Sequence, residues 1–296
     1  MKQPWYILGA GAIGSLWACH LTDLGLPVSL ILRNQAKVDL FQKQNSILLA
    51  GQCYPMTAEL ASAPKTIKQL IITTKSIDTE NAFNSIKNRL DPHAKIIVLQ
   101  NGMGSQQWIQ SQCPHAEVAW ASTTDGAWLK APFNLQHAGR GVTQIGAPDQ
   151  TYTWIDDLIK GGFLNVVQDK NISLTLWRKL AINCAINPLT AIFDCKNGEL
   201  INNPNYLSTM AAICREVELV AHAFDIDLFD GPLIEQACHV AEITAENYSS
   251  MLQDVRQGRQ TEIDSITGYL CRQAKVQNIP VPINLAYLKK IQKVHR

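Results

Sequence analysis

The 296-residue sequence lacks paired cysteine motifs, although it contains eight cysteines. None of them approaches a CxxC spacing, so neither a zinc site nor a redox-active pair is indicated. Several lie inside apolar helical patterns, where a free thiol behaves as a small hydrophobic side chain. We therefore expect reduced, structural cysteines, which are typical of a cytoplasmic protein.

Long apolar runs and an excess of charge of one sign are also missing. No stretch of about 18 apolar residues occurs, so we expect no helix that spans a membrane. The chain passes from Lys2 into a strand pattern without the apolar region of a secretion signal. A formal net charge of +1 gives no support for nucleic acid or an anionic membrane as partner. We expect a cytoplasmic protein that acts on a small molecule, with its oligomeric state left open.

A glycine-rich turn near the N-terminus joins a strand pattern to a helix pattern. Trp5–Leu8 is a short apolar strand and Ser15–Leu24 is a helix ended by Gly25; between them lies the run Gly9, Ala10, Gly11, Ala12, Ile13, Gly14. This GxGxxG, with a strand before it and a helix after it, predicts a dinucleotide-binding loop. The first glycine permits the turn, the second lets a pyrophosphate approach the backbone, and the third lets the helix pack closely. Free N–H groups at the helix start would bind the phosphates.

The residue after the second strand, Val28–Leu32, bears on the choice between NAD and NADP. An NAD enzyme places Asp or Glu there, to hold the ribose hydroxyls. This chain has Arg33 instead, with Lys37 nearby and no acid before Asp39. A guanidinium group suits a phosphate. A solvated surface arginine would give the same pattern, but the position favours NADP.

Further strand patterns predict an open parallel sheet with hairpins beside it. The ranges are a hairpin over 46–57, strands over 69–74, 95–99 and 118–121, and a second hairpin formed by 134–137 and 142–145. In such a sheet, ligands bind beyond the carboxyl ends of the strands. Lys75 and Asn101 follow two of these strands. The alternatives are a capping cation on the surface for Lys75 and a simple turn for Asn101.

The apolar periodicity becomes helical from about Asp169 and stays so to the end of the chain. At this length two domains are more usual than one, because single cores rarely exceed about 250–300 residues. We therefore predict an α/β protein. Its N-terminal Rossmann-type dinucleotide-binding domain spans residues 1–168, and an all-helical C-terminal domain spans residues 169–296.

A polar stripe runs along the otherwise apolar helix pattern from Trp177 to Pro188. Lys179, Asn183 and Asn187 are spaced four residues apart, so each lies about 40° around and about 6 Å along the helix from the previous one. Buried polar groups without partners cost about 1–3 kcal/mol each. Either a neighbouring helix completes their hydrogen bonds, or they line a cleft in which a small polar ligand does so.

A second informative segment is Asn247–Asp264. Ser250 and Asp254 lie four apart on one predicted helix, which Gly258 ends. Thr261 is a candidate N-cap of the next helix, which would place Glu262 in its first turn. Stabilisation of the helix dipole alone would explain an acid there.

Taken together, these motifs resemble the ketopantoate reductase (2-dehydropantoate 2-reductase) family along the whole chain. The specific matches are Trp177-x-Lys179-Leu180-x-x-Asn183-x-x-x-Asn187-Pro188 and Ser249-Ser250-Met251-x-x-Asp254 followed by Gly258-Arg259-x-Thr261-Glu262. The family reduces ketopantoate to pantoate with NADPH in pantothenate biosynthesis. The resemblance therefore implies an NADP-dependent oxidoreductase.

The resemblance also implies roles for individual residues. Lys179 corresponds to the proton donor, and the expected substrate contacts are Asn101, Asn183, Asn187, Asn197 and Ser250. The expected cofactor contacts are the loop Gly9–Gly14, Arg33, Lys75, Asn101 and Glu262. The roles of Asp254 and of the segment Asp125-Gly126 stay open. No metal site is expected.

Chemistry agrees with a lysine in this role. Hydride transfer to a ketone leaves an alkoxide that must be protonated or held electrostatically, and an ammonium group does both. Two alternatives remain from the sequence. One is a related NADP-dependent reductase of another 2-keto acid or an imine, and the other is a non-catalytic NADP sensor, which would not need the lysine.

Overall fold

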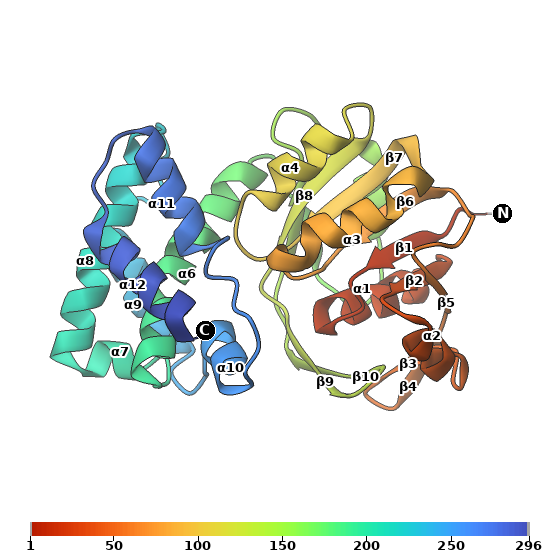
Figure 1. The fold of residues 1–296 in the computed structure, drawn as a ribbon, viewed down its shortest axis with the longest axis horizontal. Coiled ribbons are helices and arrows are strands. Elements are labelled where there is room, and N and C mark those ends of the chain that lie inside the picture. The colour runs from red at the N-terminus through yellow and green to blue at the C-terminus, as the bar shows by residue number, and fades with distance from the viewer. Residues whose placement is uncertain (1, 295–296) are drawn as a thin grey trace. The chain divides into compact units, whose positions relative to one another are not determined.

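A computed structural model describes residues 2–294 of the chain (Figure 1). The chain divides into two compact units. The first comprises the residues up to Gln100 together with Ser105–Ser173, and the second comprises Asn101–Gly104 together with the chain from Leu174 onward. The first unit is α/β and the second is helical, so the predicted fold class is confirmed.

The first unit is built on an eight-stranded sheet in the order β12-β11-β8-β7-β6-β1-β2-β5. The six consecutive strands from β8 to β5 in this order are parallel to one another. Strand β11 runs antiparallel to β8. The strands are β1 (Trp5–Leu8), β2 (Val28–Leu32), β5 (Thr57–Leu60), β6 (Ile67–Ile72), β7 (Leu90–Leu99), β8 (Glu117–Thr123), β11 (Thr143–Gly146) and β12 (Val166–Gln168).

The order of the strands fixes where a ligand would bind. From β1 the chain proceeds outward to β2 on one side, and it later returns to add β6, β7 and β8 on the other. The strand order therefore reverses between β1 and β6, and ligands of open α/β sheets bind beyond the carboxyl ends of the strands at such a point. The glycine-rich loop leaves β1 at that point.

Helix α1 (Ala12–Asp23) lies between two sheets. It contacts β1 and β2 of the large sheet, and also the four strands of a smaller sheet ordered β4-β3-β10-β9. Because both sides are covered, α1 buries eight of its twelve residues, from Gly14 to Leu21. The small sheet consists of β3 (Ser46–Leu49), β4 (Gln52–Pro55), β9 (Gly126–Ala131) and β10 (Asn134–Gly139).

The hairpin over 46–57 is confirmed, because β3 pairs antiparallel with β4. The second predicted hairpin is wrong. Strand β10 pairs with β9, whereas residues 143–146 form β11, which pairs with β8 and β12 in the other sheet. The buried carboxylate of Asp125 explains this division. It accepts hydrogen bonds from Gly141 N (3.0 Å) and from the Thr123 hydroxyl (3.0 Å), and pairs with His137 Nε2 (2.9 Å), which fixes the crossing from one sheet to the other.

The remaining helices of the first unit are short. They are α2 (Gln35–Gln42), α3 (Thr79–Ile86), α4 (Ser105–Gln112) and α5 (Asp156–Ile159), with 3₁₀ turns η1 (Ser76–Asp78), η2 (Lys87–Arg89) and η3 (Thr153–Ile155). Helix α4 packs on β7 and β8, while α2 packs on β2 and β5. Asn34 caps α2 by accepting a hydrogen bond from Lys37 N at 3.0 Å.

The second unit is a bundle of helices around α6 (Ile172–Phe193) (Figure 1). The helix continues past Pro188, one turn beyond the predicted stretch. The others are α7 (Glu199–Asn202), α8 (Pro204–His222), α9 (Leu233–Ile243), α10 (Ser250–Arg256), α11 (Thr267–Val276) and α12 (Pro282–Val294). None of the helices within residues 2–294 is long and apolar enough to cross a membrane.

The prediction of a helix starting at Thr261 is wrong. Helix α11 begins at Thr267, and residues 262–266 form turns in which Glu262 C=O accepts from Ser265 N, Ile266 N and the Ser265 hydroxyl. Thr261 is buried and its hydroxyl has no partner among the described residues, so it is not an N-cap. Glu262 thus lies on a tight turn rather than on a helix.

Candidate active site

The glycine-rich loop is packed so closely that side chains are excluded at two of its three glycines. Gly9 has φ +106°, and a Cβ there would lie 2.5 Å from Thr74 N. A Cβ on Gly14 would lie 2.1 Å from Gly9 O. The Thr73 hydroxyl donates to Gly9 O at 2.7 Å and so holds the loop against the end of β6. These two glycines are therefore required by packing.

Gly11 differs, because no described atom lies within 4 Å of where its Cβ would be. It precedes α1 in an extended conformation, and no described side chain caps the helix there. The first turn of α1 carries no acidic residue. Ala10, Ala12 and Ile13 pack partly against the core. The space beside Gly11 at the start of this twelve-residue helix is thus free of described atoms, which fits the pyrophosphate of a dinucleotide.

Arg33 and Lys75 follow β2 and β6, the two strands that flank β1. Arg33 is 73% exposed, and its Nη2 donates to Asp78 Oδ2 at 3.1 Å. Lys75 precedes η1, and its carbonyl accepts from Asp78 N at 2.9 Å. Asp78 was not among the predicted site residues. Asp78 lies three residues after Lys75, and this was the only indication in the sequence that it is near the site. Its contact with Arg33, 45 residues earlier, could not be inferred from the sequence.

Gln100, directly after β7, was not predicted as a site residue either. Its buried Nε2 donates to Thr74 O at 2.7 Å and to Thr74 Oγ1 at 2.9 Å, and it also bonds the Thr79 hydroxyl. The amide therefore holds both sides of the segment that carries Lys75.

In the second unit, Lys179 lies half-buried on α6, among fully buried apolar neighbours such as Leu180 and Ala181. Desolvation lowers the pKa of Lys179 to about 8, and the negative charge of Glu262 opposes this effect. An amine with a pKa near neutrality carries its proton at pH 7 yet releases it readily. This is the property required of a general acid.

Asn101 joins Lys179 and Glu262 in the second unit. Its Nδ2 donates to Glu262 Oε2 at 3.1 Å. The segment Asn101–Gly104 is fixed to the 262–266 turns, because Met103 N donates to Ser265 O at 2.9 Å and a Cβ on Gly102 would lie 2.5 Å from the same oxygen. The structure therefore gathers an ammonium, a carboxylate and an amide from three separate parts of the sequence.

Asn183 and Asn187 continue along α6 from Lys179. Asn183 is half-buried and Asn187 is buried. One turn further on, the Thr190 hydroxyl donates to Ser249 Oγ at 2.7 Å. Ser249 caps α10 by accepting from Leu252 N at 3.1 Å, whereas Ser250 is exposed on the first turn of that helix. The α10 start is thereby fixed beside the end of the polar stripe.

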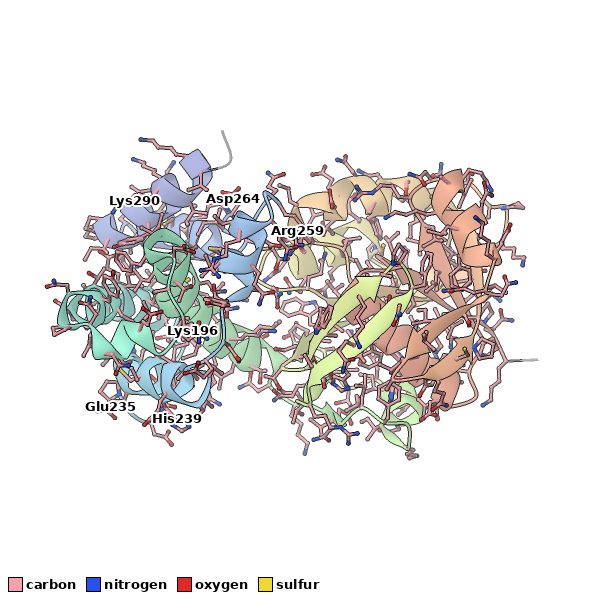
Figure 2. The ribbon with its side chains drawn as sticks, turned by 90° about the horizontal axis from the view of Figure 1, so that it is seen from below. Lys196, Glu235, His239, Arg259, Asp264 and Lys290 are labelled. Carbon is pink, nitrogen blue, oxygen red and sulfur yellow. The ribbon has the colours of Figure 1, made fainter. Side chains whose placement is uncertain are left out.

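Asn197 and Asp254 make clear structural contacts. Asn197 Nδ2 donates to Thr244 Oγ1 at 2.9 Å, and its Oδ1 is inaccessible to solvent. Asp254 is buried, and Arg259, labelled in Figure 2, donates to its Oδ1 from Nε at 2.9 Å. Arg259 N also donates to Asp254 O at 2.8 Å, so this pair fixes the chain just beyond the end of α10 at Arg256.

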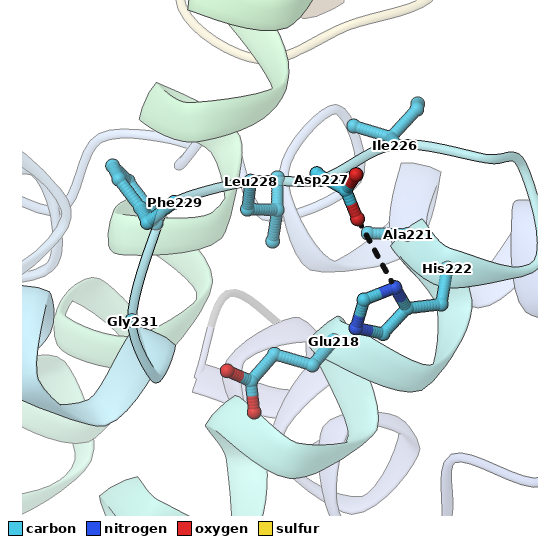
Figure 3. Close-up of a pocket in the computed structure, with 8 residues that line it drawn as sticks. All are labelled: Glu218, Ala221, His222, Ile226, Asp227, Leu228, Phe229 and Gly231. Atoms are coloured by element: carbon cyan, nitrogen blue, oxygen red, sulfur yellow. Dashed lines mark ion pairs between the residues drawn. The ribbon is translucent and has the colours of Figure 1, made fainter.

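A separate pocket lies at the end of α8 and contains none of the predicted site residues (Figure 3). It is lined by Glu218, Ala221, His222, Ile226, Asp227, Leu228, Phe229 and Gly231. Glu218 Oε1 already accepts from Leu233 N at 2.6 Å, and the His222–Asp227 pair at 3.6 Å is largely exposed. Among residues 2–294, no group of three or more His, Cys, Asp or Glu side chains could hold a metal ion, and all eight cysteines are free.

Comparison with known proteins shows the family of this chain. A family model described as "Ketopantoate reductase PanE/ApbA" matches residues 5–150, and one described as "Ketopantoate reductase PanE/ApbA C terminal" matches residues 171–295. The chain belongs to the ketopantoate reductase family. A 2-dehydropantoate 2-reductase of Vibrio cholerae is 37% identical over 293 residues, which cover 97% of this chain and 96% of the relative.

Solved structures agree with membership of the ketopantoate reductase family. A PanE/ApbA family ketopantoate reductase from Ralstonia eutropha has a TM-score of 0.90 at 27% identity, covering 99% of this chain and 98% of that one. A D-mandelate dehydrogenase in complex with NADH has a TM-score of 0.89 at 25% identity, covering 100% of this chain and 99% of that one.

Proposed function

We propose that this chain reduces ketopantoate to pantoate with NADPH and that Lys179 donates the proton. The observation that carries the proposal is the cluster of Lys179, Glu262 and Asn101 in the helical unit of a chain that belongs to the ketopantoate reductase family. The Vibrio cholerae relative is named 2-dehydropantoate 2-reductase, which supports ketopantoate as the substrate.

The glycine-rich loop would hold the pyrophosphate of the dinucleotide at the N-terminus of α1. Gly11 leaves the necessary space, and no described side chain competes for the N–H groups. Arg33 and Lys75 would bind the phosphate on the adenosine ribose, which distinguishes NADPH from NADH. When bound, NADPH supplies the hydride.

Lys179 supplies the proton and the positive charge. As the ketone carbon accepts hydride, negative charge develops on its oxygen, and a nearby ammonium stabilises that charge and then transfers a proton. Burial makes the ammonium a stronger acid, while Glu262 keeps it protonated near neutral pH. Glu262 also accepts from Asn101, which fixes the orientation of the amide. We further propose that Glu262 and Asn101 contact the cofactor.

The polar stripe would bind the rest of the substrate. Asn183 and Asn187 lie about 6 Å and 12 Å along α6 from Lys179. That separation suits the hydroxyl beyond the dimethyl carbon of ketopantoate, while Asn101 and Ser250 would contact the carboxylate. For Asn197 the structure shows a bond to Thr244, so its contact with substrate rests on the family resemblance.

A second candidate is reduction of another 2-keto acid with NADH. The likeness to D-mandelate dehydrogenase, whose structure contains NADH, favours it. The carboxylate of Asp78 beside Arg33 favours it as well, since NAD enzymes use an acid at the ribose.

Cofactor oxidation measured with a panel of keto acids tests the proposal. The panel contains ketopantoate, its analogue without the hydroxyl, and phenylglyoxylate, each with NADPH and with NADH. We expect the highest kcat/KM for ketopantoate with NADPH. Preference for phenylglyoxylate with NADH would support the second candidate, and binding of NADPH without turnover of any keto acid would indicate a sensor.

A further inference from the structure

No acid directly follows β2, but Asp78 in η1, which follows β6, lies beside Arg33. The side chain of Arg33 follows β2 and meets Asp78, which follows β6, at 3.1 Å between Nη2 and Oδ2. Strand β1 lies between β2 and β6. The pair therefore reaches across the carboxyl end of the strand from which the glycine-rich loop emerges.

Asp78 is held by its own backbone and by its neighbours. Its N–H donates to Lys75 O at 2.9 Å, and the hydroxyl of the buried Thr79 donates to the same carbonyl at 3.2 Å. Gln100 bonds the Thr79 hydroxyl in turn. The backbone position of Asp78 is thus fixed by buried hydrogen bonds, although its side chain is half-exposed.

The two possible cofactors differ at the ribose in a way that a carboxylate distinguishes. A 2′-hydroxyl can donate a hydrogen bond to a carboxylate, which accepts only. A 2′-phosphate is anionic, so the carboxylate repels it. The phosphate must also compete with the carboxylate for Arg33. Arg33 has further donors left, because Asp78 engages Nη2 alone among the interactions of its guanidinium that the structure describes.

Building on the proposed function, we infer that Asp78 sets the cofactor preference of this chain. Its carboxylate accepts from the ribose 2′-hydroxyl of NADH and opposes the phosphate of NADPH, so the chain binds both dinucleotides and its preference for NADPH is moderate. Since the pair is largely exposed, each of the two effects amounts to about twofold to fivefold.

Direct binding tests this inference without any keto acid. The dissociation constants of NADPH and NADH are measured by fluorescence titration for the unaltered chain and for Asp78→Asn, which keeps the shape and removes the charge. We expect NADPH to bind more tightly and NADH to bind more weakly, each by about twofold to fivefold. The control Glu80→Gln removes a nearby exposed charge and should leave both dissociation constants unchanged.

A second variant separates the direct contact from an effect through Arg33. In an Arg33→Ala background, Asp78→Asn should still weaken NADH, because the hydroxyl donates to Asp78 itself. If that loss disappears, or if the two dissociation constants move together in Asp78→Asn, the inference is overturned. It is also overturned if the unaltered chain does not bind NADH. The proposed function fails independently, when ketopantoate is not reduced although the dinucleotides bind.

Discussion

The glycine-rich loop of the first unit and the polar stripe of the second offer different chemical groups to a ligand. The loop offers backbone N–H groups, and a Cβ on Gly9 would lie 2.5 Å from Thr74 N. Helix α6 uses its backbone within the helix, so only its side chains can act. Changes at Gly9, but not at Gly11, should therefore alter folding as well as cofactor binding, whereas changes in the stripe should alter substrate binding and chemistry.

Lys179→Ala tests the second half of this comparison and should have the largest effect. A positioned proton donor contributes about 10²–10⁴-fold, so kcat should fall by that factor while the dissociation constant of NADPH stays unchanged. Steady-state kinetics and fluorescence titration provide the two numbers. Lys196→Ala, which removes an exposed cation of the same unit (Figure 2), should leave both near normal.

If Lys179→Ala keeps near-normal turnover, another group protonates the substrate. If it loses the cooperative unfolding transition while Lys196→Ala keeps it, the stripe is a structural network instead.

Arg33→Ala should weaken NADPH by about tenfold to a hundredfold, because a hydrogen bond to a charged group contributes about 1.5–3 kcal/mol. The KM for NADH should change little. Lys37→Ala, which removes a neighbouring cation on α2, is the matched control. Equal losses for NADPH and NADH would make Arg33 a structural residue.

A pair of glycine substitutions tests the first half of the comparison. Gly9→Ala places a methyl group against the backbone at a positive φ, so it should lower the free energy of unfolding by about 1–3 kcal/mol or more. Gly11→Ala meets no described atom, so its thermal midpoint should stay within a few degrees while the cofactor binds more weakly. Denaturation curves of both variants measure stability, and titrations with the cofactor measure binding. Equal stability of the two would mean that Gly9 is not constrained as described.

Local patterns were sufficient to predict the parts of the fold whose partners are close in sequence. Strands β1 and β2 and the glycine loop were predicted correctly because apolar runs, glycines and a following helix are adjacent. The hairpin predicted for 134–145 failed because β10 and β11 take partners in different sheets. The choice depends on the buried carboxylate of Asp125, which contacts both His137 on β10 and Gly141 before β11, and hydrophobic periodicity does not report these contacts.

The candidate site shows the same limit. The spacing of Lys179, Asn183 and Asn187 follows from helix geometry alone. Glu262 was assigned to a helix, since a threonine followed by acids is typical of an N-cap. Instead its turn is shaped by contact with Asn101–Gly104, about 160 residues earlier in the chain. Asp78 was missed for the same reason, because its partner Arg33 follows a different strand and lies 45 residues earlier in the chain.

Asn183→Ala should have a small and specific effect. A site that hydrogen-bonds a substrate hydroxyl discriminates strongly against an analogue that lacks it. We expect the variant to lose about tenfold in kcat/KM for ketopantoate and little for the deoxy analogue, so the ratio between them shrinks. The ratio of kcat/KM for ketopantoate to kcat/KM for the deoxy analogue is measured in the unaltered chain and in Asn183→Ala. An unchanged ratio would show that Asn183 does not contact the substrate hydroxyl.

The pH dependence of kcat/KM tests the central claim most directly. A proton donor at Lys179 would act in its protonated form, so activity should be full below the pKa of Lys179 and decline as the pH rises through about 8. Because the charge of Glu262 raises that pKa, Glu262→Gln should move the decline to lower pH. Activity that stays constant up to pH 10, or a decline that Glu262→Gln leaves in place, would contradict the assignment of Lys179 as the proton donor.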